Sequence, residues 1–230
     1  MKGAAILNAF IATAVAAPRQ HHGSLLRRAD RDTSIVWAGG VVRSENITAV
    51  TGTFRVIRST LPTVSEPGKH AYSASAWIGI GGYTKVRSGT RLSMNCILIL
   101  PVFLDIGNIP DGDTIKVSLG VLSSTQANVD LENQSTGKGF SQTTNITHPI
   151  CQKTAEWIVE RSYILSGLVG LIDFGTETID NIAYTASDES HTTVPDDVIL
   201  VDIVNDEAKN TIQTHTKSHE GSIQVTFHGS

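Results

Sequence analysis

Thr154-Ala155-Glu156-Trp157-Ile158-Val159-Glu160 is the stretch that decides the fold of this chain. Successive residues of a β-strand point to opposite faces of the sheet. Ala155, Trp157 and Val159 therefore share one face, and Glu156, Ile158 and Glu160 share the other. The tryptophan face is expected to be buried, and the face with two glutamates is expected to be solvated. Taken alone, the stretch predicts an ordinary sandwich strand.

Short runs of the same alternating kind occupy much of the remaining chain. Turn-forming clusters such as Glu66-Pro67-Gly68 and Pro110-Asp111-Gly112 separate them. No convincing amphipathic helix longer than two turns is visible outside the N-terminal segment. Many short strands spaced by turns predict an all-β protein, built as an antiparallel sandwich or barrel. The runs expected as strands are Ile35–Val42, Val50–Ile57, Ala74–Ile80, Thr114–Leu122, Asn128–Leu131, Glu156–Val159, Glu177–Ile182, Val198–Val204 and Ser222–Phe227.

The N-terminus is typical of a secreted protein. Residues 1–17 combine Lys2, a short apolar core and the small residues Ala14-Val15-Ala16, as in a signal peptide. Residues 18–32 are expected to be either a pro-segment, trimmed after Arg27-Arg28, or a disordered arm. Residues 33–230, about 200 in number, suffice for a single domain with a large core. We expect a monomer.

Charge and composition exclude several classes of partner. The net charge is −4, and no basic stripe interleaved with aromatic residues is present, so a nucleic-acid surface is not expected. No run reaches about 18 apolar residues, so no membrane span is expected. Three sequons, at Asn46, Asn133 and Asn145, are glycosylation candidates if the chain is secreted.

Common catalytic and metal-binding motifs are missing from the sequence. Gly-x-Ser-x-Gly, His-Glu-x-x-His and Cys-x-x-Cys do not occur, and Gly79, Gly81 and Gly82 do not form a dinucleotide fingerprint. His215 and His219 lack further obvious ligands and are expected in a solvated loop. No metal or cofactor is expected.

Seven short segments, in order along most of residues 33–180, resemble the eqolisins, a family of glutamic endopeptidases. The segments are Thr33–Val42 (TSIVWAGGVV), Val50–Val56 (VTGTFRV), Ser75–Gly82 (SAWIGIGG), Asp111–Val117 (DGDTIKV), Val129–Lys138 (VDLENQSTGK), Cys151–Glu160 (CQKTAEWIVE) and Leu171–Ile179 (LIDFGTETI). The resemblance implies a concanavalin A-like sandwich of two curved, packed sheets. It also implies a secreted acid endopeptidase that acts on polypeptides.

In that family, the glutamate of the matching strand is the general base that activates a water, which places this role on Glu156. A free glutamate has a pKa of about 4.3, so Glu156 is expected to be ionised at moderately acidic pH. Trp37 and Glu160 are expected to line the substrate cleft, whereas Trp77 is expected in the core. Four strand residues span about 13 Å, so Glu156 and Glu160 are not expected to share a proton.

The sequence departs from the family pattern at Gly81, where an aspartate is expected, and at Arg161-Ser162, where Asp-Phe is expected. The segment that carries the family's catalytic glutamine is also missing, and the best local match places Arg87 there. In a neighbouring reading frame, the codons for Met94-Asn95-Cys96 give Glu-Leu whatever synonyms are used. We therefore hypothesise that residues 84–100 arise from a frame slip or a mis-set splice boundary. The chain as written is expected to be a poor catalyst.

The two cysteines, Cys96 and Cys151, can pair in an oxidising compartment. Cys151 stands where the family has a paired cysteine, whereas Cys96 does not match the partner's position.

Two other functions agree with a sandwich of this kind. One is a glycoside hydrolase, because such enzymes also place two carboxylates on one strand face, as Glu156 and Glu160 do. The other is a non-catalytic, lectin-like binding module, which the loss of the glutamine would favour.

Overall fold

The computed structural model describes residues 30–83, 109–147, 149–164, 167–187, 189–191, 195, 198–205 and 211–229. Strands, turns and irregular segments make up all of these ranges. They contain no α-helix, and so none with the length and apolarity to cross a membrane. The expected signal peptide, most of the expected pro-segment and residues 84–100 lie outside the described part of the chain.

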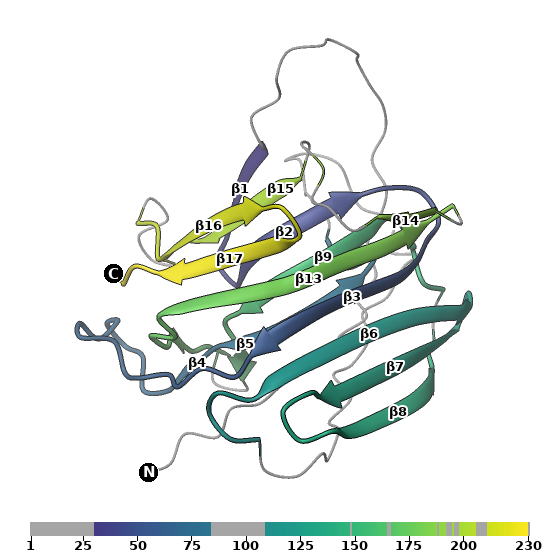
Figure 1. The fold of residues 1–230 in the computed structure, drawn as a ribbon. Helices are drawn as coiled ribbons and strands as arrows, with labels where there is room; N and C mark the ends of the chain where they lie inside the picture. Colours follow the sequence, from purple (N-terminus) through teal and green to yellow (C-terminus); the bar gives the residue numbers. More distant parts are fainter. Residues whose placement is uncertain are drawn as a thin grey trace.

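Two large sheets form the fold (Figure 1). The five-stranded sheet has the order β1 (Asp30–Ser34), β15 (Ile199–Ile203), β2 (Trp37–Arg43), β9 (Thr154–Glu160) and β5 (Ser75–Ile80). All its neighbours are antiparallel except β1 and β15. The strand β9 lies between β2 and β5, so the stretch that decides the fold is an interior strand.

The second sheet has eight strands and lies in front of β9 and β5 in Figure 1. Its order is β16 (Thr214–His219), β17 (Ser222–Phe227), β13 (Thr176–Ala186), β3 (Ile47–Arg55), β6 (Thr114–Ser123), β7 (Gln126–Asn133) and β8 (Lys138–Asn145), with β14 (Glu189–His191) paired to β13. Two small pairs complete the described strands: β4 (Tyr72–Ser73) with β12 (Gly170–Leu171), and β10 (Tyr163–Ile164) with β11 (Gly167–Leu168).

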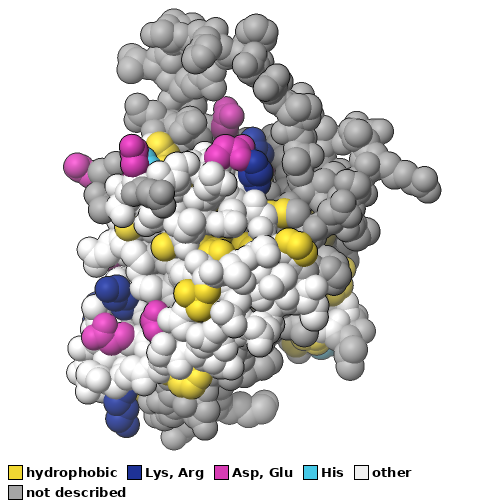
Figure 2. Space-filling view, turned by 90° about the vertical axis from the view of Figure 1, so that its right-hand side faces the viewer, with side chains coloured by type: hydrophobic (Ala, Val, Ile, Leu, Met, Phe, Trp, Pro, Cys, Tyr) yellow, Lys and Arg dark blue, Asp and Glu magenta, His cyan; other side chains and the backbone are white. Residues whose placement is uncertain are grey.

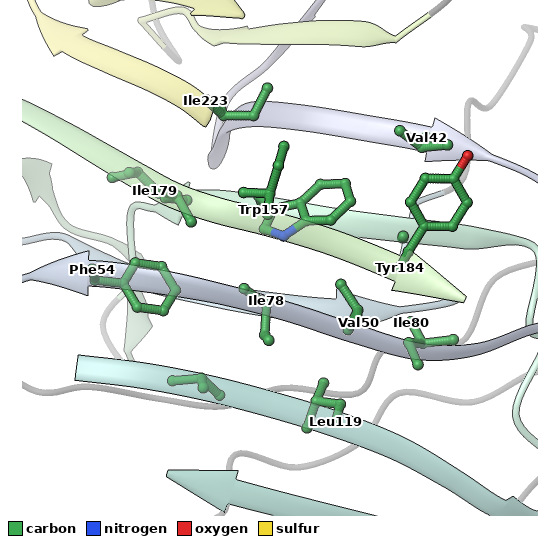
Figure 3. Packing of buried hydrophobic residues seen from close by; sticks show 14 of the residues in the cluster. Val42, Val50, Phe54, Ile78, Ile80, Leu119, Trp157, Ile179, Tyr184 and Ile223 are labelled. Atoms are coloured by element: carbon green, nitrogen blue, oxygen red, sulfur yellow. The ribbon is translucent and has the colours of Figure 1, made fainter. Parts of the chain in front are cut away.

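The main core fills the space between the two sheets. Figure 3 shows side chains from both, including Trp157 and Ile78 from the five-stranded sheet and Phe54, Ile179 and Leu119 from the eight-stranded sheet. The indole Nε1 of Trp157 donates to the carbonyl oxygen of Thr51 at 2.8 Å, which satisfies its polar atom inside the core. The apolar face predicted for β9 is confirmed.

Two glycines in β2 permit close approaches that a side chain would prevent. A Cβ at Gly39, where φ is +145°, would lie 2.0 Å from the carbonyl oxygen of Trp157. A Cβ at Gly40 would lie 2.6 Å from Cδ1 of Ile223. The Gly-Gly pair therefore lets β2 pack against both β9 and β17.

Every run expected as a strand forms one, within a few residues at its ends. Two polar segments differ from expectation. The strand β1 begins at Asp30, inside the segment expected to be either a pro-segment or a disordered arm, because it pairs along β15. The loop expected around His215 and His219 is wrong: both lie in β16, where the buried hydroxyl of Thr216 donates to the carbonyl of Val201 at 2.7 Å.

Cys151 is disulfide-bonded, in agreement with the position that the resemblance gives it. Cys96, the other cysteine of the sequence, lies outside the described residues.

Candidate active site

Glu156 lies on β9, between β2 and β5 of the five-stranded sheet, on the face turned away from the main core. In the strand register it is opposite Val41 of β2 and Gly79 of β5. Its side chain has no exposed surface, so the expectation that this face is solvated is wrong. The apolar side chains that share this face form a second cluster, which consists of Val41, Trp77, Ile158, Ile199 and Val201, with Trp37 and Tyr83 packed against it.

The two carboxylate oxygens of Glu156 have different surroundings. Oε1 accepts hydrogen bonds from the backbone N–H of Gly82 at 2.7 Å and of Tyr83 at 2.9 Å. Gly81, with φ of +82°, turns the chain at the end of β5 so that these consecutive amides face the carboxylate. Oε2 is buried and has no hydrogen-bond partner among the described residues. This oxygen is therefore the one available to accept a proton.

Burial raises the pKa of Glu156 from 4.5 to about 7. The N–H groups of Tyr83 and Gly82 act in the opposite direction, because they stabilise the carboxylate, and so does the nearby hydroxyl of Thr154, although it makes no hydrogen bond of normal geometry. Burial therefore opposes the ionisation of Glu156 that is expected at moderately acidic pH.

Glu160 and Trp37 come together on the same face as Glu156, four strand residues farther along. They are directly opposite each other in the β2–β9 register. Oε2 of Glu160 accepts a hydrogen bond of 2.8 Å from Nε1 of Trp77. The Trp37 and Trp77 rings meet edge to face, with centroids 5.4 Å apart. Trp77 is buried, as expected, but it belongs to the second cluster and not to the main core. Burial raises the pKa of Glu160, and the two indole N–H groups oppose that shift.

Tyr83 and Asp32 are members of this site that sequence reasoning missed. The Tyr83 hydroxyl donates to Oδ2 of Asp32, and the guanidinium carbon of Arg43 lies over the Tyr83 ring, 5.7 Å from its centroid. Burial and the Asp32 carboxylate raise the pKa of Tyr83. Asp32 and Tyr83 are 51 residues apart, and no sequence motif links them.

The departure at Arg161 has a structural explanation. The Arg161 side chain is fully buried, and its Nη1 lies 3.0 Å from Oε2 of Glu66 and 3.1 Å from Oε1 of Gln213. Its Nε and Nη2 donate to the carbonyl of Ile35. Arg161 therefore links Ile35, Glu66 and Gln213 just after the C-terminal end of β9. None of these hydrogen bonds involves Glu156.

The three sequons differ in how accessible their asparagines are. Asn46, in the β2–β3 turn, and Asn145, at the end of β8, are exposed. Asn133 is 5% exposed, and its Nδ2 donates to Asp113 at 2.6 Å. Because a glycan would attach to that nitrogen, the geometry favours Asn46 and Asn145.

The described structure also has a hollow away from Glu156. A hollow of about 540 Å³ lies on the eight-stranded sheet, lined by Asp180, Asn181, Ile182, Ala183, Glu220 and Gly221. On the end of the sandwich that Figure 2 shows, charged side chains are scattered and form no basic stripe. The described ranges contain no group of three or more His, Cys, Asp or Glu side chains that could hold a metal ion.

Comparison with known proteins gives matches over most of the chain. The model of the Peptidase A4 family matches residues 35–96 and 101–227. Aspergillopepsin-2 of Aspergillus niger is 28% identical over 222 residues, covering 83% of this chain and 77% of that protein.

Two solved structures share the fold. Scytalido-glutamic peptidase, in complex with a peptide-based transition state analog, superposes with a TM-score of 0.65 at 19% identity, covering 84% of this chain and 98% of that one. Aspergilloglutamic peptidase from Aspergillus niger superposes with a TM-score of 0.53 at 22% identity, covering 85% of this chain and all (100%) of that one. The two-sheet sandwich predicted from the sequence is thereby confirmed.

Proposed function

This chain belongs to the Peptidase A4 family of glutamic peptidases, the eqolisins, and on that premise we propose that it is an endopeptidase in which Glu156 is the general base. The proposal rests on the different surroundings of the two carboxylate oxygens of Glu156. Oε1 is held by two backbone N–H groups, while Oε2 has no partner among the described residues. A carboxylate fixed in this way presents one lone-pair-bearing oxygen to a reactant.

In the proposed reaction, Oε2 of ionised Glu156 takes a proton from a water molecule as the water oxygen attacks the peptide carbonyl carbon. The proton then passes from Glu156 to the leaving amine nitrogen as the C–N bond breaks, which regenerates the carboxylate. The developing oxyanion needs a hydrogen-bond donor. The family supplies it from a glutamine, whereas the segment that should carry this glutamine is missing here and residues 84–100, which contain no glutamine, stand in its place. Losing one such donor costs about 10²–10³ in turnover.

We propose that the polypeptide substrate lies along the face of Trp37, Glu160 and Glu156. Trp37 is partly exposed, so its ring has surface left for an apolar side chain. Glu160 is fixed by the indole of Trp77 at 2.8 Å and so offers its carboxyl group in a defined direction.

The test is cleavage of a denatured protein from pH 3 to pH 8 by the wild type and by Glu156→Gln. Glu132→Gln is the matched control, because Glu132 is exposed on β7 in the other sheet. Loss of cleavage in Glu156→Gln alone supports the proposal. Equal cleavage by all three proteins refutes the role of Glu156. Sugar release from a polysaccharide would instead favour a glycoside hydrolase, and binding without turnover would favour a lectin-like module.

Two further proposals concern parts of the chain outside the described residues. Residues 84–100 result from a frame slip or a mis-set splice boundary, and an uninterrupted transcript frame matching them would refute this. Secretion rests on the signal-like residues 1–17. N-terminal sequencing of the protein recovered from culture medium tests whether residues 1–17 are removed as a signal peptide. The presence of residue 1 in that protein would contradict their removal.

A further inference from the structure

We propose that Tyr83 is a positioning residue for Glu156: its side chain, anchored on Asp32 of β1, holds two backbone N–H groups against one carboxylate oxygen. The catalytic consequence of this inference rests on the proposed function of Glu156. The structural relationship itself does not, and it can be measured without any substrate.

The chain turns toward Glu156 where β5 stops pairing with β9, after Ile80. The N–H of Gly81 still donates to the carbonyl of Thr154, at 2.8 Å, and so continues the ladder. The next two N–H groups, of Gly82 and Tyr83, leave the ladder and donate to Oε1 of Glu156. Gly81 and Gly82 have no side chains that could hold this turn, and glycine has the widest choice of backbone angles.

Tyr83 supplies the missing anchor. Its backbone N lies 2.9 Å from Oε1 of Glu156, while its hydroxyl reaches Asp32. Asp32 is on β1, at the opposite edge of the sheet from β5, and pairs in register with Val201 of β15. Tyr83 therefore connects the two edges across the same face on which Glu156 lies.

The Tyr83 ring is also held from its face. The guanidinium of Arg43, at the end of β2, lies over the ring, 5.7 Å from the centroid. The ring thus has a cation over one face and a carboxylate at its hydroxyl, which restricts its rotation and translation. Because the two N–H donors share Oε1, this anchor also determines that Oε2 remains available as the proton acceptor.

The charged groups near Glu156 on this face do not provide an alternative anchor. Asp32 and Arg43 contact Tyr83, and Glu160 is hydrogen-bonded to the indole of Trp77. Among the described residues, Tyr83 links Glu156 to the two charged groups on β1 and β2, through its backbone N–H, its hydroxyl and its ring. A hydroxyl-specific change at Tyr83 should therefore affect Glu156 and leave the core packing in place.

The experiment is a carboxyl titration by NMR of protein labelled with ¹³C at Glu Cδ, in which Glu156→Gln identifies the Glu156 signal. Tyr83→Phe removes only the hydroxyl, and Asp32→Ala removes its acceptor. Tyr163→Phe is the control, because Tyr163 is 68% exposed. Loosened N–H donors stabilise the carboxylate less, so both test variants should raise the pKa of Glu156 by about one pH unit. The control should leave it unchanged.

An unchanged pKa of Glu156 in folded Tyr83→Phe overturns the proposal, and so does an equal shift in Tyr163→Phe. If Tyr83→Phe does not fold, Asp32→Ala gives the same comparison with the Tyr83 ring intact. Peptidase assays on the same variants add a second readout: kcat should fall while KM is retained. If Glu156→Gln keeps full peptidase activity, the proposed function fails, whereas the titration still decides the positioning role.

Discussion

Arg161 and Glu66 form an ion pair inside the protein, with Nη1 and Oε2 3.0 Å apart and side-chain exposures of 0% and 3%. The other oxygen of Glu66 accepts the backbone N–H of Leu171 at 2.7 Å. A charge pair this far from water is held in place by hydrogen bonds to both partners, and the loss of either partner leaves the other charge uncompensated.

We expect Arg161→Met to lower the free energy of unfolding by about 3–5 kcal/mol, because Glu66 would remain buried without its partner. The double variant Arg161→Met/Glu66→Gln should recover part of that loss. Urea unfolding measures both. Lys153→Met is the control: its partner Glu45 and Lys153 itself are exposed, so about 1 kcal/mol or less should be lost. Equal losses in Arg161→Met and Lys153→Met would contradict the importance of burial.

The pH dependence of peptide cleavage should show an ascending limb near pH 7. The pKa of Glu156 is raised to about 7 by burial, and a general base works only when ionised. Below that pH, kcat/KM should fall about tenfold for each pH unit. Initial rates between pH 3 and pH 8 check this. Full activity at pH 4 without a limb near pH 7 would show that substrate binding or another group determines the profile.

Stability should decrease as pH rises from about 4.5 to about 8, in part because of Glu177. Burial, with a smaller contribution from Asp180, raises the pKa of Glu177 to about 8. Between 4.5 and 8 the folded state therefore holds a proton that the unfolded state has released, so stability is greatest below pH 4.5 and is lost toward pH 8. The loss from this group is on the order of 4 kcal/mol.

Glu177→Gln should reduce this pH dependence, because an amide does not titrate. Thermal unfolding at pH 4 and pH 8 is the measurement, with Glu189→Gln as the exposed control. The remaining slope should come from other groups with raised pKa values, including Glu156 and Glu160. If wild type and Glu177→Gln lose the same stability between the two pH values, the assignment to Glu177 is wrong.

Gly39→Ala should destabilise the five-stranded sheet severely. The new Cβ would meet the carbonyl oxygen of Trp157 at 2.0 Å, and backbone in an adjacent strand cannot move without breaking its ladder. We expect a loss on the order of 3 kcal/mol or more. Gly120→Ala is the matched change in β6, where a Cβ meets nothing within 4 Å, and it should change stability by about 1 kcal/mol or less. Similar urea midpoints for the two variants would contradict this account.

The sequence alone determined nine of the strands and which face of β9 enters the core. Alternation with a period of two is a local property of the sequence. The runs that form β2, β3, β5, β6, β7, β9, β13, β15 and β17 were therefore all predictable. Strands without that alternation were not. The residues of β8 are nearly all polar and exposed, and β16 is buried through Thr214 and Thr216, so neither has a recognisable apolar pattern.

Only the tertiary structure decided the chemical state of the candidate site. The sequence identified Glu156 and its face, but the burial that raises its pKa is a property of the folded chain. Tyr83 and Asp32 are hydrogen-bonded although 51 residues separate them in the sequence, and Arg161 and Glu66 form an ion pair although 95 residues separate them. A strand's two faces follow from its own residues, whereas the groups that cover each face depend on the pairing of distant strands. Solvation, hydrogen bonding and therefore pKa depend on those groups.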